Sequence, residues 1–370
     1  MKKLIYLSSY AFADVDFPII KRLKEYFDLY YIVIFGKQRS PIYSQQEVAD
    51  YCNKNSVRHK IYTRKRRVSD FREIVTDYKV VREINNSKPD VIYMEFTGVF
   101  VPLLTKLLIG GKKTVYAEHD VLLHRGSNSL LEYVHHELVY KLFNNIQVFS
   151  KTQKDIFQKK YPRKRVFFVP LALKDFGQVT SKDLDRKEDK VNFLFFGSIR
   201  YNKGLDFLIK AANKLAREYD NFKVTIAGGC SQFDDYRRLI EKPEVFELDV
   251  RPIPAEEVPR VFARADIMVL PYRDVTQSGC LLTGYNYNVP PIASDFPGFR
   301  EYITDGREGF LFESENVDAL YECMKKIMQM SRKEIEQMKA NVAEFVKKEI
   351  DIDDIVHRYV AFLNETADNN

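Results

Sequence analysis

Short runs of β-branched and aromatic residues alternate with segments of helical spacing along the whole chain. Such alternation is typical of parallel βαβ units, so the pattern predicts an α/β protein built on parallel sheets. The expected strands of the first half are LIYLSS, LYYIVIF, VIYMEF, KTVYAEH, IQVFS and RVFFVP. Those of the second half are VNFLFFG, FKVTIAGG, ADIMVLPY, PPIASD and GFLF.

The length of the chain predicts more than one domain. It has 370 residues, 45% of them hydrophobic, which is more than a single core usually holds. Apolar content falls and charge rises over residues 173–190, so we place a linker there. We therefore expect Rossmann-like domains over residues 1–172 and 191–345, with a ligand cleft between them at the carboxyl ends of the strands, and a helical segment over 346–370.

Three segments are expected to be helical. Residues 69–84 and 127–143 carry apolar side chains at helical spacing. Ser331 begins the sequence Ser-Arg-Lys-Glu, which matches a capping box. The remainder of the chain is expected to be helical to about Ala367.

Charge and cysteine content narrow the class of protein. The net charge of +6 comes from 58 basic and 52 acidic residues, which permits anionic ligands without indicating nucleic acid. The longest apolar stretch, VFVPLLTKLLIGG, is too short to span a membrane, and no signal-peptide pattern precedes the first strand. A cytoplasmic protein with reduced thiols is expected, because no CxxC spacing occurs among Cys52, Cys230, Cys280 and Cys323.

Common nucleotide-binding motifs are missing from the sequence. Neither GxGxxG nor GxxxxGK[ST] occurs, which argues against a dinucleotide dehydrogenase and a P-loop nucleotidase. The motifs HExxH and GxSxG are absent as well. A phosphate site in this chain must therefore be built in another way.

Two junctions between a strand and a helix in the second half are suited to an anion. Gly197 follows a strongly apolar strand, and Lys203-Gly204 begins a long amphipathic helix. Ser278-Gly279 begins a second, apolar helix after another strand. We expect no acid in the first turn of either helix, so that free N–H groups, dipoles and the lysine together attract a diphosphate. The alternative for the first junction is a capped strand with a solvated lysine.

These residues carry a resemblance to a known family. The segment from Gly197 to Gly204, the AGG at 227–229, and the runs VPRVFARADIMVLPY, TQSG, PPIASDFPGFREYI and DGREGFLF resemble the donor domain of family 4 retaining glycosyltransferases. The family is also called glycosyl transferases group 1 and has the GT-B fold. AEHDVLLHRGS at 117–127 is similar to the segment with the family's active-site histidine.

The resemblance implies a fold and a reaction. The fold would be GT-B, with two Rossmann-like domains facing each other across a cleft and C-terminal helices crossing back to the first domain. The reaction would be transfer of a sugar from a nucleotide diphosphate-sugar to a glycan or polyprenyl-linked acceptor, with retained configuration. No metal and no cofactor is expected. Assembly of a surface polysaccharide or another glycoconjugate is the expected role.

The resemblance also implies roles for individual residues. Lys203 matches the family's lysine at the diphosphate, and His119 matches the histidine beside the transferred sugar. The family's arginine is replaced by Ser198, so Arg200 is the candidate substitute. The donor site is expected to include Gly197, Ser198, Gly204, Gln277, Ser278, Gly279, Cys280 and Thr283. Acceptor or loop candidates are Ser8, Ser9, Asp120 and His124.

The absence of a paired-glutamate motif that many family members carry leaves other functions open. The paired glutamates, EX7E, fall on Val275 and Thr283, and neither is acidic. A catalytically weak subunit that binds sugar nucleotide or a partner enzyme is therefore one alternative, and a GT-B sugar-nucleotide epimerase or hydrolase is another. Asp14 and Asp16 form a DxD, which we interpret as an acid pair at a helix start rather than as a metal site.

A basic run lies in the half expected to receive the acceptor. Its members stand between Tyr62 and Phe71 and are Arg64, Lys65, Arg66 and Arg67. A solvated run of charges is the ordinary interpretation. The functional alternative is peripheral contact with anionic lipid at the inner face of a membrane, which would suit a polyprenyl-linked acceptor. Nucleic acid ranks behind both, because no recognition module accompanies the run.

Overall fold

The computed structural model divides into two compact units, Met1–Asp175 with Asp351–Asn370, and Phe176–Ile350. Asp120, His124 and residues 175 and 181–189 of the expected linker lie outside the part of the chain that it describes. The described residues are 1–36, 43–68, 70–119, 121, 130–174, 176–180 and 190–369.

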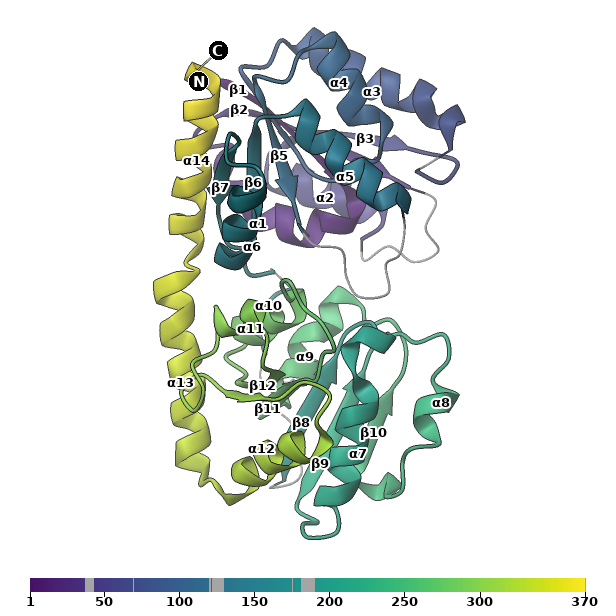
Figure 1. The fold of residues 1–370 in the computed structure, drawn as a ribbon, viewed down its shortest axis with the longest axis vertical. Helices are drawn as coiled ribbons and strands as arrows, with labels where there is room; N and C mark the ends of the chain where they lie inside the picture. The colour runs from purple at the N-terminus through teal and green to yellow at the C-terminus, as the bar shows by residue number, and fades with distance from the viewer. Residues whose placement is uncertain are drawn as a thin grey trace. The chain divides into compact units, whose positions relative to one another are not determined.

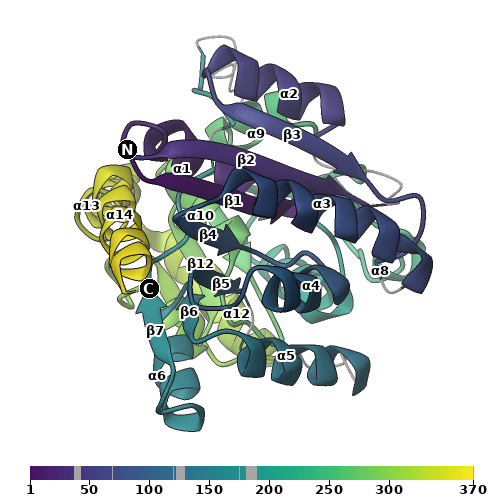
Figure 2. The same ribbon diagram turned by 90° about the horizontal axis from the view of Figure 1, so that it is seen from above.

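The first unit contains a seven-stranded parallel sheet in the order β3-β2-β1-β4-β5-β6-β7 (Figures 1 and 2). The strands are β1 (Lys3–Ser9), β2 (Asp28–Phe35), β3 (Arg58–Thr63), β4 (Val91–Met94), β5 (Thr114–Glu118), β6 (Asn145–Val148) and β7 (Arg165–Phe168). All six expected strands are present, and β3 is an addition. Its sequence, RHKIYT, has no continuous apolar run because β3 lies at the edge of the sheet and none of its residues is fully buried.

Helices cover both faces of this sheet. They are α1 (Ala13–Leu23), α2 (Gln45–Lys54), α3 (Ile74–Ser87), α4 (Phe100–Leu108), α5 (Leu130–Leu142), α6 (Lys151–Lys160) and α14 (Ile352–Asp368), with short 3-10 helices η1 (Tyr10–Phe12) and η2 (Phe71–Glu73). Figure 2 shows α3, α4 and α5 together along one face. Helix α14, from the end of the chain, packs against α1, β4 and β5.

The second unit contains a six-stranded parallel sheet in the order β10-β9-β8-β11-β12-β13. The strands are β8 (Val191–Phe196), β9 (Phe222–Ala227), β10 (Phe246–Asp249), β11 (Ile267–Leu270), β12 (Pro291–Ser294) and β13 (Phe310–Phe312). The five expected strands are present. The unexpected one is β10, which the sequence reading missed because it is a short edge strand, FELD, with only Phe246 buried.

The helices of the second unit include those that begin at the two expected junctions. They are α7 (Leu205–Leu215), α8 (Asp234–Arg237), α9 (Val258–Ala263), α10 (Gly279–Asn286), α11 (Pro297–Arg300), α12 (Val317–Gln329) and α13 (Arg332–Glu349), with 3-10 helices η3 (Tyr201–Lys203), η4 (Pro243–Val245) and η5 (Ala255–Glu257). Side chains of α7, α12 and α13 share one hydrophobic core with β8 and β9.

The C-terminal segment forms two helices. Ser331 caps α13 with both hydrogen bonds of the predicted capping box, so that expectation is confirmed. Helical structure breaks at Ile350, and Asp351 then accepts hydrogen bonds from the N–H groups of Asp353 and Asp354 at 2.9 and 3.2 Å. A capping side chain therefore starts a second helix within the segment expected to be helical.

Each sheet has one point where the order of its strands reverses. The reversal falls between β1 and β4 in the first unit and between β8 and β11 in the second. Loops that leave the carboxyl ends of two such strands go to opposite faces of the sheet, which leaves room for a ligand. Each unit therefore offers one preferred position for a binding site.

Two further expectations can be compared with the described residues. The four cysteines are free thiols. None of the helices found among the described residues has both the length and the apolar composition needed to cross a bilayer. The segment VFVPLLTKLLIGG contains α4, whose Val101 and Thr105 are buried in the first unit.

Helix α14 is held to the first unit by its apolar face, and this can be tested. Leu363 is fully buried in that face. Leu363→Ala should lower the free energy of unfolding by about 2 to 5 kcal/mol, because the surrounding core cannot fully close the cavity. Arg358→Ala, on the exposed side of the same helix, should change it by less than about 0.5 kcal/mol in urea denaturation. Equal effects of the two substitutions would contradict the packing described here.

Candidate functional site

In the second unit, backbone segments meet closely at the point where the strand order reverses. Gly197, with φ +105°, follows β8, and a Cβ atom there would lie 2.8 Å from Sγ of Cys280 in α10. A Cβ at Gly204, with φ +64°, would lie 1.8 Å from the carbonyl oxygen of Pro271, just after β11. The backbone leaves no room for a side chain at Gly204, and at Gly197 the positive φ disfavours one and the Cys280 side chain would have to move. These two glycines therefore bring the loop after β8 against the end of β11 and the start of α10.

The positive end of the α10 dipole is not compensated by an acidic residue in the first turn of the helix. Ser278 is its N-cap, and its Oγ accepts a hydrogen bond from the N–H of Leu281 at 3.2 Å. The same hydroxyl lies 3.5 Å from the Tyr272 hydroxyl, to which it donates. The first turn contains no acid, so the sequence prediction is confirmed for this helix. Its N-terminus attracts negative charge from outside the helix.

Helix α7 differs from the prediction, because Asp206 lies in its first turn. The expectation that neither helix has a first-turn acid is therefore wrong for α7. Arg273 compensates the carboxylate with two hydrogen bonds, of 3.0 and 2.8 Å. Arg273 is itself buried, at 9% exposure, and donates to the carbonyl oxygen of Tyr201 at 2.6 Å. The pair ties the start of α7 to the end of β11.

Lys203 is held at the centre of this arrangement. Its Nζ lies 3.8 Å from the ring centroid of Tyr272. Burial raises the pKa of Tyr272 well above its ordinary value, so the ring stays neutral and can face a cation. Because Tyr272 also receives the hydrogen bond of Ser278, one buried ring links the ammonium group to the N-cap of α10. This ring is the common support of the proposed diphosphate site.

The other candidate site residues of the second unit differ in how exposed they are. Ser198 and Arg200 are both exposed, with buried Ile199 between them, so Arg200 shares the exposed side of Ser198. Gln277 is half-buried in the loop before α10. Thr283 is 2% exposed, and its hydroxyl donates to the Gly279 carbonyl oxygen at 2.8 Å. The hydroxyl of Thr283 is therefore satisfied within the helix.

In the first unit, a pocket of about 370 Å³ opens where the strand order reverses. Its walls come from the segments at the carboxyl ends of β1, β2, β3 and β4. They include Ser9, Tyr10, Phe12, Ile34, Arg64, Arg67, Phe96 and Thr97. The pocket therefore combines aromatic rings, hydroxyl groups and guanidinium groups from four loops.

His119 lies beside this pocket, directly after β5. Its ring stacks between Phe12, at 4.1 Å between ring centroids, and Phe149, at 4.3 Å. Its Nε2 lies 3.7 Å from Oε1 of Glu95. Two stacked rings fix the plane of the imidazole, and 14% of the side chain is exposed. Since Phe12 also lines the pocket, the histidine is a rigid neighbour of that cavity.

A buried polar network supports His119 and was not predicted from the sequence. Ser8, which is fully buried, donates to Oε2 of Glu95 at 2.7 Å, and Tyr93 donates to Oε1 at 3.3 Å. Asp16 accepts hydrogen bonds from two further tyrosine hydroxyls, at 2.9 and 3.0 Å. Burial raises the pKa of Glu95 to about 7 and that of Asp16 well above its usual range. The signal in the sequence was a glutamate directly after the apolar strand VIYM.

The remaining predicted residues of the first unit have local partners. Ser9 caps the 3-10 helix η1, with its Oγ 3.5 Å from the Ala11 nitrogen, and it lines the pocket. Asp14 and Asp16 lie in the first turn of α1, as the helix-start interpretation expects, and Asp14 pairs with Lys174 at 2.5 Å. In the described ranges, no group of three or more His, Cys, Asp or Glu side chains is placed to hold a metal ion.

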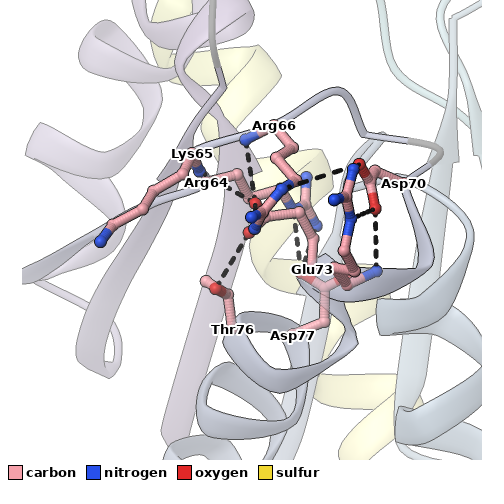
Figure 3. Close-up of polar contacts among 8 residues, drawn as sticks. Arg64, Lys65, Arg66, Asp70, Glu73, Thr76 and Asp77 are labelled. Atoms are coloured by element: carbon pink, nitrogen blue, oxygen red, sulfur yellow. Dashed lines mark hydrogen bonds and ion pairs between the residues drawn. The ribbon is translucent and has the colours of Figure 1, made fainter.

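The basic run after β3 is partly internal (Figure 3). Arg64 is 5% exposed, and its Nη2 lies 2.7 Å from Oδ1 of Asp77, which is fully buried. Glu73 accepts hydrogen bonds from the backbone N–H groups of Lys65 and Arg66 at 3.1 and 2.9 Å. Arg64 therefore does not belong to the exposed charges, whereas the other three basic side chains of the run are exposed.

Comparison with known proteins agrees with the geometry of the second unit. Residues 190–330 match the family model described as glycosyl transferases group 1. The match is confined to this segment, which is similar to the group 1 glycosyltransferases. It contains every predicted donor-site residue, so the resemblance read from Gly197 to Gly204 and from TQSG is confirmed.

A curated relative matches over a similar length. It is the GDP-mannose-dependent alpha-(1-6)-phosphatidylinositol monomannoside mannosyltransferase of Mycolicibacterium smegmatis, 33% identical over 127 residues. The match covers 32% of this chain and 33% of the relative, so the chain spans about a third of that relative's length. The likeness in sequence is thus concentrated in part of each protein.

Solved structures match over the whole chain. Anabaena Alr3699/HepE, in complex with UDP and glucose, has a TM-score of 0.76 at 14% identity, covering 99% of this chain and 100% of that one. A glycosyltransferase from Rickettsia africae has a TM-score of 0.77 at 14% identity, with full coverage of both chains. The predicted GT-B fold, with its two parallel Rossmann-like sheets, is confirmed.

The polar network beside His119 predicts a specific dependence of stability on pH. Because the pKa of Glu95 is raised from 4.5 to about 7, the folded protein keeps a proton that the unfolded chain loses over this range. The free energy of unfolding therefore falls as pH rises from about 5 to 8. Glu95→Gln should remove up to about 3 kcal/mol of that fall. Denaturant titrations of both proteins at pH 5 and pH 8 measure it.

A matched control separates this effect from general titration. Glu25 is exposed, so Glu25→Gln should leave the pH dependence of the parent protein unchanged. The buried environment assigned to the Glu95 carboxyl would be wrong if Glu95→Gln and the parent protein lost the same stability between the two pH values.

Proposed function

We propose that this chain is a glycosyltransferase that moves a sugar from a nucleotide diphosphate-sugar to a glycan or lipid-linked acceptor, with retention of configuration. The observation that carries the proposal is the support of Lys203 and Ser278 by the same buried ring of Tyr272, at the start of the acid-free helix α10. The group 1 match supports it. So do a relative named as GDP-mannose-dependent and a structural neighbour solved with UDP and glucose.

Stabilisation of the leaving diphosphate follows from this arrangement. As the glycosidic bond loosens, negative charge accumulates on the diphosphate. The Lys203 ammonium and the free N–H groups at the start of α10 are fixed before that charge appears, so little reorganisation is needed. Arg273 neutralises Asp206, which would otherwise repel an anion near the same helix start. Arg200, on the exposed side of its loop, is assigned as a second cation.

The first unit is assigned to the acceptor and to the transferred sugar. The His119 imidazole is held in one plane by two aromatic rings and is assigned to a sugar hydroxyl. The pocket lined by Ser9, Phe12 and Phe96 is assigned to the acceptor. Glu95 acts through His119 as a positioning residue, because its carboxyl lies 3.7 Å from Nε2 of the imidazole.

A catalytically weak subunit is the second candidate function. The observation that favours it is Thr283, which has no carboxylate where the EX7E motif has a glutamate and whose one hydroxyl proton is already donated to the Gly279 carbonyl oxygen. Such a protein would still bind sugar nucleotide through Lys203 and α10. It would differ from a transferase in the rate of transfer, not in donor binding.

Peripheral membrane contact belongs to the same proposal. Lys65 and Arg66 are exposed after β3, and Phe71 and Val75 are exposed nearby along η2 and α3, at 72% and 59%. Basic and apolar side chains together suit the headgroup region of an anionic bilayer. A location at the inner face of the cytoplasmic membrane, in assembly of a surface polysaccharide, would follow.

Replacing Lys203 tests the proposed function. With UDP- and GDP-sugars as donors, Lys203→Ala should lower the transfer rate about a hundredfold to a thousandfold, or ~2.7 to 4 kcal/mol. Donor binding should weaken less, because the charge that lysine meets grows toward the transition state. Lys210→Ala removes an exposed lysine of the adjoining helix and should keep the parent rate. A folded Lys203→Ala protein with the parent rate would refute the diphosphate site.

The proposed use of a lysine side chain and backbone N–H groups predicts that the reaction needs no metal ion. Lys203 and the α10 N-terminus take the part that a divalent ion plays in metal-dependent transferases. Sugar transfer should therefore continue at nearly the same rate in excess EDTA. Loss of most activity on chelation, with recovery on addition of Mn²⁺, would instead show that a metal ion is required.

A further inference from the structure

We propose that the pocket of the first unit selects an acidic sugar, one that carries a carboxylate or phosphate group, through Arg64 and Arg67. The proposal rests on the proposed function, since it names the chemical class of the acceptor. It concerns the cavity of about 370 Å³ at the carboxyl ends of β1 to β4. That volume is within the usual range of small-molecule sites, ~300 to 1,000 Å³.

Arg64 has an unused hydrogen-bond donor in this pocket. Its Nε donates to Asp77 at 2.8 Å, and its Nη2 donates to the carbonyl oxygen of Thr97 at 2.5 Å. Among the described residues, Nη1 has no hydrogen-bond partner, although Arg64 is only 5% exposed and lines the cavity. Nη1 is not one of the buried side-chain atoms that lack a partner, so it is open to solvent from the cavity. A ligand oxygen in the pocket would satisfy it.

The position of Arg64 is fixed before any ligand binds. Gly98, with φ +89°, brings the loop after β4 close to the basic run, and a Cβ there would lie 2.3 Å from Cγ2 of Val68. Glu73 holds the turn that leads to Arg67 by accepting two backbone N–H groups, as Figure 3 shows. A preorganised site loses less entropy when it binds a ligand.

The charge of the pocket is positive. Its lining, as far as the described residues go, contains two arginines and no aspartate or glutamate. Asp77 compensates Arg64, whereas Arg67 is exposed and has no ion pair within the described part of the chain. The nearby Asp70 carboxylate pairs with Arg72 instead. A guanidinium group presents two parallel N–H donors that match a carboxylate or a phosphate.

The aromatic lining favours a sugar over a small inorganic anion. Phe96 is 40% exposed at the wall of the pocket, and Tyr10 and Phe12 complete an apolar side. Apolar ring faces pack well against the C–H faces of a sugar ring. The cavity therefore offers one surface for the ring and another for its negative charge.

Calorimetric titration of the full chain with three methyl glycosides tests the proposal. The ligands are methyl glucoside, methyl glucuronide and methyl glucoside 6-phosphate. At least one acidic ligand should bind about tenfold tighter than the neutral one, a difference of about 1.4 kcal/mol. The stronger of the two acidic ligands identifies carboxylate or phosphate as the preferred group.

Two substitutions in the pocket, with a control outside it, test whether the preference for acidic ligands comes from the pocket. Arg67→Gln should reduce the ratio of acidic to neutral affinity to near one, since Arg67 is exposed and its loss should not disturb folding. Lys79→Gln removes the same charge from an exposed site on α3 outside the pocket lining, and should keep the tenfold ratio. Arg64→Lys retains the positive charge but removes the guanidinium N–H donors. It should weaken the binding of the acidic ligands only.

The outcomes separate this proposal from the proposed function. Equal affinity for all three ligands, no binding of any of them, or a preference that survives Arg67→Gln would overturn the acidic-sugar site. These titrations contain no nucleotide-sugar, so they do not depend on transfer. Failure of the transferase proposal would appear separately, as a Lys203→Ala protein that transfers sugar at the parent rate.

Discussion

The second unit depends on close contact between backbone segments at the carboxyl ends of its central strands. Gly204 lies against the Pro271 backbone at a separation that excludes any side chain, and Gly197 lies against the Cys280 side chain. This contact brings the loop with Lys203 to the start of α10. Without it, the lysine and the helix dipole would be two separate, weak attractions for an anion. Their closeness is the basis for proposing that both act on one diphosphate.

Each unit has an ion pair beside its candidate site, which is buried for Arg64–Asp77 and partly buried for Arg273–Asp206. In the second unit, Arg273 and Asp206 fix the start of α7 next to Lys203. In the first, Arg64 and Asp77 fix the loop that carries Arg67. A buried pair has little net effect on stability when it is complete, but it defines a geometry. The neighbouring basic side chain, Lys203 or Arg67, follows a segment that the pair holds in place.

Much of the fold could be predicted from the sequence, because buried parallel strands are nearly continuous apolar runs. The two missed strands, β3 and β10, lie at sheet edges, where one side of the strand is solvated and the apolar run is interrupted. The donor-site residues could be proposed from the sequence because they are close together in it and follow strands. Glu95 and Arg273 were missed because their partners, Ser8 and Asp206, are distant in sequence.

The sequence by itself determined the α/β class, the two parallel sheets, the Ser278 cap and the group 1 resemblance, because each depends on local pattern or spacing. Only the tertiary structure decided which charges remain available. In the sequence, the four basic residues at 64–67 look equivalent. In the structure, Arg64 is buried against Asp77 and the other three are exposed. Asp206 was not expected in the first turn of α7, and in the structure Arg273 neutralises it. Pairing of charges depends on distances between segments far apart in the chain, and folding alone sets those distances.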